Sequence, residues 1–238
     1  MRHRLTAFAV LAAAIAFALS PLASSGFAGF SADQFPILQD NPPVQPAGYA
    51  FSIWGVIYAW LILGAGFGAW KTAEDPDWRA MRMPLLISLG VGIFWIAAAN
   101  ASPILATVMI VLMAASAITA MLRAGSTSPA WQVRPVALYA GWLTAASGVG
   151  IGVLLGGYGI MASQNAAVVC LIGVLIVALY SQSRRPHEWG YPAAVIWALV
   201  GVIVANAAPA NWPVIALALV GIVVLALRSI QSLNSKAA

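Results

Sequence analysis

Eight apolar runs, each near the length of a membrane-spanning helix, alternate with short polar segments along the chain. A spanning helix needs roughly 20 mostly apolar residues, with a range of about 17 to 25. The runs lack the period-two alternation of strands, and only helices or closed barrels satisfy the backbone in lipid. The pattern therefore predicts an all-α polytopic membrane helix bundle with about eight transmembrane helices, at residues 5–23, 51–70, 84–100, 104–122, 136–157, 165–181, 192–207 and 213–227.

Basic residues occupy alternate connecting segments of this pattern. Short segments rich in Lys and Arg mark the cytoplasmic side of a membrane protein. Counted from the N-terminus, the even-numbered segments carry no basic residue and only Asp33 and Asp40. Adding or removing one helix in the middle would place basic residues on both sides. The pattern predicts an even number of spans with both termini in the cytoplasm. The odd-numbered segments hold all 11 basic residues: Arg2, Arg4, Lys71, Arg79, Arg82, Arg123, Arg134, Arg184, Arg185, Arg228 and Lys236.

The first run has an alternative interpretation. The sequence "MRHR", an alanine-rich core and then "ALSPLASSGFA" resembles a secretory signal peptide. Cleavage would leave seven helices and an external N-terminus. The remaining charge pattern would be unchanged, so it does not decide between the two.

Composition supports the membrane assignment. Hydrophobic residues make up 62% of the chain and charged residues 7%, against about 25% charged in soluble domains. Lipid must therefore be the solvent for most of the surface, and the bilayer is the expected partner. The net charge of +5 could suggest nucleic acid. The basic residues form no patch with interleaved aromatic residues, so we predict no nucleic-acid partner.

The chain offers few groups for metal, redox or acid–base chemistry. Its one cysteine, Cys170, excludes an intrachain disulfide and a cysteine-based zinc site. His3 and His187 lie outside the apolar runs, and no ionisable residue falls within a predicted span, which argues against a proton pump or a charged channel. No Ser-His-Asp set, carboxylate pair or phosphate-binding glycine loop is found. We predict no cofactor, no metal and no enzymatic activity.

The longest external segment, 24–50, contains "FPILQDNPPVQPAGYAF". Pro42, Pro43 and Pro46 make it stiff and non-helical. It could form a lid over one end of the bundle, or it could be an ordinary proline-rich connector, and composition alone favours the connector.

Ten tryptophans are many for this length. Several fit an aromatic belt at the headgroup level. Trp60, Trp95, Trp142 and Trp197 lie several residues within their runs and fit the belt less well. They could be packing residues, or they could line an aromatic pocket for a flat hydrophobic ligand.

Three segments resemble a known family. The segment "PAGYAFSIWGVIYAW", running to "AWK", resembles the start of the second helix in the tryptophan-rich sensory protein, or translocator protein (TspO/MBR), family. The match needs one deletion after Phe51 and one insertion before Trp70. "FWIAAAN", with Trp95, resembles the third helix, and "VRPVALYAGWLTAAS", with Tyr139 and Trp142, resembles the fifth. The matching positions near the second helix are Pro46, Tyr49 in place of Trp, Phe51, Trp54, Tyr58, Trp70 and Lys71.

The order and spacing of five helices resemble the family, whereas the last three have no counterpart in its short five-helix members. The whole chain is similar to the family's longer bacterial branch. The resemblance implies a translocator-protein-like region at 1–158 with the external loop 24–50, and three additional helices at 159–238 in one integrated membrane domain. It also implies the bacterial inner (cytoplasmic) membrane. The sequence leaves a homodimer open.

The resemblance implies binding of porphyrins, haem intermediates or sterol-like molecules between the helices, with the proline-rich loop as lid. Roles proposed for the family include transport, tetrapyrrole-linked signalling and porphyrin breakdown. This chain departs from the family pattern at three positions, which bears on the ligand more than on the fold. Gly92 and Gly150 stand where the family has Asn, and Tyr49 stands where it has the lid Trp.

The first hypothesis is therefore a membrane protein that binds a hydrophobic planar ligand, with a sensory or transport role. The alternatives are a permease for a small uncharged solute, built around the Asn-Pro corners at Asn100 and Asn206, and a membrane enzyme acting on porphyrin or lipid. The expected ligand-binding residues fall into three groups. Tyr49, Phe51, Trp54 and Tyr58 would form the rim and wall, Trp95, Tyr139 and Trp142 would line the depth, and Asn100, Thr144 and Ser147 would supply hydrogen bonds.

Overall fold

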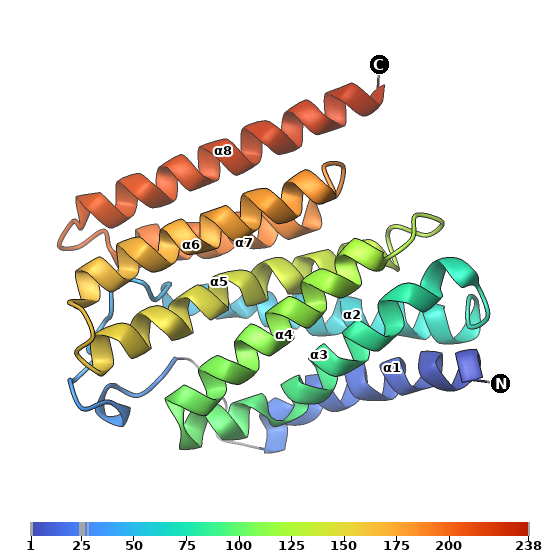
Figure 1. The fold of residues 1–238 in the computed structure, drawn as a ribbon, viewed down its shortest axis with the longest axis horizontal. Coiled ribbons are helices and arrows are strands. Elements are labelled where there is room, and N and C mark those ends of the chain that lie inside the picture. The colour runs from blue at the N-terminus through green and yellow to red at the C-terminus, as the bar shows by residue number, and fades with distance from the viewer. Residues whose placement is uncertain (1, 24–26, 28, 238) are drawn as a thin grey trace.

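The computed structural model describes residues 2–23, 27 and 29–237, so part of the predicted 24–50 loop lies outside the described residues. The described chain folds into eight α-helices joined by turns and short 3-10 segments, and contains no strand (Figure 1). The all-α membrane bundle predicted from the sequence is confirmed. The helices are α1 (Arg2–Leu19), α2 (Ile53–Trp70), α3 (Pro76–Ala101), α4 (Pro103–Arg123), α5 (Val133–Gly157), α6 (Ser163–Arg184), α7 (Gly190–Ala205) and α8 (Trp212–Ala237).

Seven of these helices are long and apolar enough to cross a membrane, and α7 is shorter, with 16 residues. At 1.5 Å per residue α7 is about 24 Å long, against a hydrocarbon core of about 30 Å. It is nevertheless apolar throughout and packs against α5 and α8. Residues 2–19 form α1, which packs on α2 and α3. The signal-peptide alternative for this segment stays a prediction.

Local signals in the sequence explain where two of the helices begin. Asp75 precedes Pro76, and its carboxylate accepts a hydrogen bond from the Asp77 N–H. Ser102 precedes Pro103, and its hydroxyl accepts from the Leu105 N–H. A short polar N-cap followed by proline suits a helix start, because proline lacks the N–H that the first turn would leave unpaired.

The helix α5 lies at the centre of the bundle (Figure 1). About two thirds of its membrane-spanning window is buried, compared with 28–44% in the other six long helices. It contacts α2, α4, α6 and α7. Small residues along α5 permit these close approaches: Gly141 faces the backbone of α7, and Gly148 faces Val174 of α6. A site built on α5 can therefore draw residues from most of the bundle.

The basic side chains lie at one end of the bundle, and two of them donate hydrogen bonds to helix C-termini there. The guanidinium of Arg82 is buried and donates to the carbonyls of Gly68, Thr72 and Ala73 at the end of α2. Arg185 donates to the carbonyls of Leu122 and Ala124 at the end of α4. Carbonyls at a helix C-terminus lack intrahelical partners and carry partial negative charge. The residues that predict the cytoplasmic face thus also cap the helices that end there.

The predicted spans were too short at this end. The helix α3 begins at Pro76, eight residues before the predicted start at Pro84, and so includes Arg79 and Arg82. The physical reason is that long basic side chains reach polar partners from the last turns of a spanning helix. The expectation that no ionisable residue lies in a spanning helix therefore fails for the end turns of α3.

Candidate functional site

The segment between α1 and α2, called the α1–α2 loop below, crosses the end of the bundle opposite the basic residues (Figure 1). The loop is tied to the helices on both flanks. On one side, Gln34 Nε2 donates to the Ala99 carbonyl at the end of α3, 3.1 Å away. On the other, Asn206 Nδ2 donates to the Pro43 carbonyl at 2.9 Å, and Trp197 Nε1 of α7 donates to the Ala50 carbonyl at 2.8 Å. These bonds hold the loop across the ends of α3, α5 and α7.

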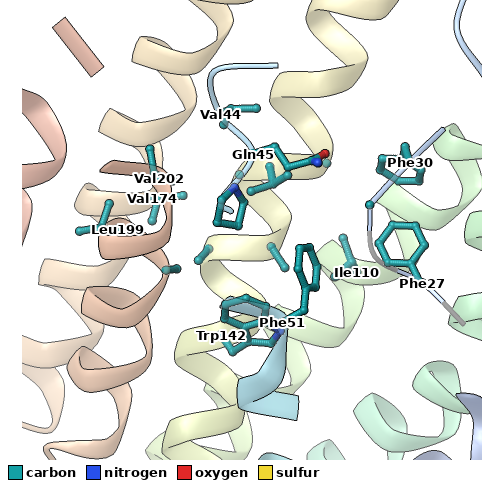
Figure 2. A pocket seen from close by; sticks show the side chains of 18 of the residues that line it. Phe27, Phe30, Val44, Gln45, Phe51, Ile110, Trp142, Val174, Leu199 and Val202 are labelled. Carbon is teal, nitrogen blue, oxygen red and sulfur yellow. The ribbon is translucent and has the colours of Figure 1, made fainter. Parts of the chain in front are cut away.

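A cavity lies beneath the α1–α2 loop (Figure 2). The unfilled space between its walls is about 810 Å³. This figure includes space that is open to the surroundings. The cavity itself has a volume of about 60 Å³. The cavity is therefore narrow in this conformation. Its lining comes from the loop and from α2, α3, α4, α5, α6 and α7.

Aromatic rings form one wall of the cavity. The ring of Trp142, from α5, meets Phe51 edge-on at 5.8 Å between centroids and Trp54 at 6.1 Å. On the opposite flank, Phe27 of the loop packs edge-on against Trp95 of α3 at 4.7 Å. Phe51 lies at the end of the loop and Trp54 one turn later in α2. Edge-to-face packing of this kind is the favoured geometry of aromatic pairs.

Few polar groups reach this apolar space. Trp142 is 3% exposed, and within the described part of the chain its indole N–H has no hydrogen-bond partner. Trp95 differs, because its N–H donates to the Ala106 carbonyl at 2.9 Å. The amide of Gln45 extends from the loop toward the side of the cavity where Phe27 and Phe30 lie (Figure 2). The arrangement suits a ligand that is mainly hydrophobic and carries few polar groups.

A model of the TSPO-like protein family matches residues 5–230 of the chain. The chain belongs to this family. The search found no match among proteins with curated descriptions and none among solved structures. The matched region runs from the first turn of α1 through most of α8, so it includes the three helices beyond α5. The family assignment made from the second, third and fifth helices is confirmed.

Four of the expected ligand-binding residues of this TSPO-like protein line the cavity. They are Phe51, Trp54, Trp95 and Trp142. Two more lie in the layer next to them. Tyr58 stacks on Trp54 at 5.2 Å, and Tyr139 is fully buried with its hydroxyl 3.0 Å from Ser88 Oγ. This layer supports the aromatic wall from the side of the basic end.

The two hydroxyls expected to bind a ligand are used within the bundle. The Thr144 hydroxyl donates to the Ala140 carbonyl at 2.9 Å and lies 2.8 Å from the Tyr191 hydroxyl of α7. The Ser147 hydroxyl donates to the Leu143 carbonyl at 2.8 Å. Helical Thr and Ser often bond the carbonyl one turn back in this way. The structure thus places neither residue in the cavity lining.

The remaining two expected residues lie near the surface. Tyr49 is 45% exposed and meets the ring of Trp197 edge-on at 5.6 Å. Asn100 is exposed, and its carbonyl accepts a hydrogen bond from Gln34 Nε2. Both hold the α1–α2 loop against the helices and neither lines the cavity.

Sequence reasoning missed the aliphatic side of the cavity. Five residues of this side come from the helices beyond α5: Leu171, Val174, Ala198, Leu199 and Val202. In a membrane helix such residues look the same whether they face lipid or a cavity, so no pattern could have identified them. Phe27, Phe30 and Gln45 of the loop were also missed, although an aromatic or amide side chain in a suspected lid was a usable signal.

The two glycines that replace family asparagines have different surroundings. A Cβ atom at Gly92 would lie 2.7 Å from the Phe17 ring and 3.0 Å from the Met113 methyl group. That position is filled by packing and leaves no room for an amide. Gly150 lines the cavity, and a Cβ atom there would lie 3.0 Å from the Thr107 hydroxyl, which is buried and has no hydrogen-bond partner among the described residues. A polar group of α4, the Thr107 hydroxyl, thus lies behind this wall, and Thr107 does not itself line the cavity.

Proposed function

We propose that this TSPO-like membrane protein binds a planar, mainly hydrophobic small molecule of the porphyrin or sterol type beneath the α1–α2 loop, without converting it. The observation that carries the proposal is the apolar cavity with an aromatic wall at Phe51, Trp54 and Trp142. Ligand pockets occupy roughly 300–1,000 Å³ and are lined mainly by apolar and aromatic side chains with a few polar groups. The lining of this cavity has that composition, and its walls must separate for its volume to reach that range.

Ligand entry requires movement of the α1–α2 loop. The volume of the cavity is only about 60 Å³, so a rigid planar ring enters only when the walls separate. Hydrogen bonds from Asn206 and Trp197 hold one part of the loop on α7. In this proposal the loop acts as a lid that closes over the bound molecule, and the indole N–H of Trp142 donates to an acceptor on it.

Packing below the cavity favours a binding protein over a permease. Phe17, Tyr58 and Tyr139 form an aromatic layer beside Trp54 on the side of the basic end, with centroid distances of 5.1 and 5.7 Å from Phe17 to the two tyrosines. Tyr139 is fully buried. Among the described residues the cavity lining stops at this layer. A sensory role fits a closed site of this kind.

The membrane placement completes the proposal. The protein is a multi-pass membrane protein. We place it in the cytoplasmic membrane of a bacterium, with the basic end in the cytoplasm and the loop and cavity on the outer side. The charge pattern supports this orientation, and the resemblance to the longer bacterial branch of the family supports the compartment.

Titration of the protein in nanodiscs with protoporphyrin IX tests the proposal. We expect saturable quenching of tryptophan fluorescence. Trp142→Phe should weaken the affinity up to about tenfold, which corresponds to about 1.4 kcal/mol and to the loss of one hydrogen bond. Trp70→Phe is the matched control, because Trp70 is 70% exposed at the opposite end of α2 and its loss should leave the affinity unchanged. Linear quenching that neither variant alters would refute the proposed site.

Two further readouts separate the alternatives. A binding protein should leave the porphyrin absorption spectrum unchanged after prolonged incubation and should give no porphyrin flux in liposomes. A spectrum that changes with time and with the amount of protein would establish an enzyme. Flux that depends on the protein would establish a permease.

A further inference from the structure

A second recess lies at the other end of the molecule, between the end of α6 and the last turns of α8. It is lined by Gln182, Pro186, Arg228, Gln231 and Ser232, and we call it the α6–α8 groove. Its volume is about 280 Å³. The groove is wider and more polar than the cavity under the α1–α2 loop. It lies at the end that carries the basic residues.

The groove presents a cation that nothing in the described chain neutralises. Arg228 is exposed and makes no ion pair or hydrogen bond with the residues that the structure describes. It lies near the end of the apolar part of α8, whose candidate span runs to Ser232. At that depth a guanidinium meets the phosphates of the lipid headgroups. Arginine binds phosphate oxygens with strong, charge-assisted hydrogen bonds.

Gln182, which lines the groove, has a buried acceptor that lacks a donor among the described residues. Gln182 is 3% exposed, and its Nε2 donates to the Leu225 carbonyl at 3.1 Å and to Ser229 Oγ at 2.9 Å. The Leu225 carbonyl can only accept, so it fixes the orientation of the amide. The Oε1 atom is then left without a partner among the described residues. Buried polar atoms are normally paired, so an unpaired oxygen beside a recess indicates a missing donor.

Apolar side chains continue from the groove along the membrane-facing surface. Val223 and Leu227 of α8 are each more than half exposed, and they share a helix face with Gln231 of the groove through the spacing of four residues. Leu227 lies one turn and Val223 two turns before Gln231. A molecule with a polar phosphate head and long apolar chains would match both parts of this surface.

We propose that the α6–α8 groove binds the headgroup of an anionic phospholipid that carries a hydroxyl group, such as phosphatidylglycerol. Arg228 holds the phosphate, and a headgroup hydroxyl donates to Gln182 Oε1. The acyl chains lie along the exposed face of α8. The site is distinct from the cavity under the α1–α2 loop and needs neither that ligand nor that function. The lipid headgroup bridges α6 and α8 at the groove between their ends.

Native mass spectrometry of the purified protein with an equimolar mixture of phosphatidylglycerol and phosphatidylcholine tests the site. We expect a retained phosphatidylglycerol adduct, with its occupancy reduced at least fivefold by Arg228→Gln. The matched control is Arg184→Gln, which removes an exposed arginine at the end of α6 that does not line the groove. It should leave occupancy within twofold of the wild type. Equal losses in both variants, or no preference between the two lipids, would overturn the proposal.

Two further arms test the source of the phosphate and the role of Gln182. Soluble glycerol 3-phosphate at millimolar concentration should not displace the lipid, because it lacks the acyl chains. Displacement would assign the groove to a soluble phosphate ester. Phosphatidylethanolamine and phosphatidylcholine share the phosphate, but only the former has N–H donors. At least a twofold preference for phosphatidylethanolamine is expected. Equal binding of the two lipids would show that Gln182 does not bond the headgroup.

Discussion

Replacement of Gly141 by alanine is expected to destabilise the protein by about 3 kcal/mol, the upper end of the usual cost of overpacking. A Cβ atom at this position would lie 2.3 Å from the Tyr191 carbonyl oxygen and 3.0 Å from Ala194 Cβ. The first of these is a backbone atom of α7, so no side chain can turn aside to make room. The two helices would have to separate. Because α5 and α7 both line the cavity, ligand affinity should fall together with stability.

Gly173→Ala provides the matched control on the neighbouring helix α6. No atom outside its local helix backbone lies within 4 Å of the position of its Cβ atom. Alanine favours helix over glycine by about 1 kcal/mol, so this variant should be neutral or slightly more stable. Thermal unfolding in detergent, followed by intrinsic fluorescence, measures both. Equal melting temperatures for the two variants would contradict the close α5–α7 contact.

Arg82→Gln is expected to cost about 2–3 kcal/mol, within the range for hydrogen bonds to charged groups. The guanidinium is 3% exposed and donates to four carbonyls, among them Thr72 at 2.8 Å and Ala73 at 2.6 Å. The fourth is His3, at 3.2 Å, which ties α1 to the same point. Glutamine is shorter and cannot reach these groups, so the carbonyls of Gly68, Thr72 and Ala73 at the end of α2 would lose this donor.

The control for Arg82 is Arg79→Gln, in the same helix and one turn earlier. Arg79 is exposed, and its described hydrogen bond goes to the Glu74 carbonyl. Its loss should change stability by less than about 0.5 kcal/mol, as is usual for surface positions. The denaturant or thermal midpoint of both variants, measured in the same detergent, compares the two losses of stability. A cost for Arg79→Gln that equals the cost for Arg82→Gln would show that charge, and not capping, sets the effect.

The sequence predicted the helices well where apolar length alone defines them. The predicted run at 104–122 became α4 (Pro103–Arg123), and the run at 136–157 became α5 (Val133–Gly157). It underestimated α3 and α8, because hydropathy ends a span at the first charges whereas the helix continues past them. The N-cap at Asp75 followed by Pro76 was a readable start signal for the longer α3.

The site was predictable only in part. Aromatic residues such as Trp54 and Trp142 are conspicuous within an apolar run, and they line the cavity together. The hydroxyls of Thr144 and Ser147 were equally conspicuous, but each bonds a carbonyl one turn back in its own helix. The sequence cannot show which face of a helix meets α7 and which meets a cavity. The contributions of α6 and α7 to the lining depend on tertiary packing that no local pattern encodes.

The position of a bound porphyrin tests the central claim most directly. Crystals of the protein grown in a lipid phase with zinc protoporphyrin IX would locate the metal by its anomalous scattering. We predict one strong peak beneath the α1–α2 loop, between Phe51, Trp142 and Gln45. A peak on the lipid-facing surface, or at His3 or His187 at the basic end, would contradict the account.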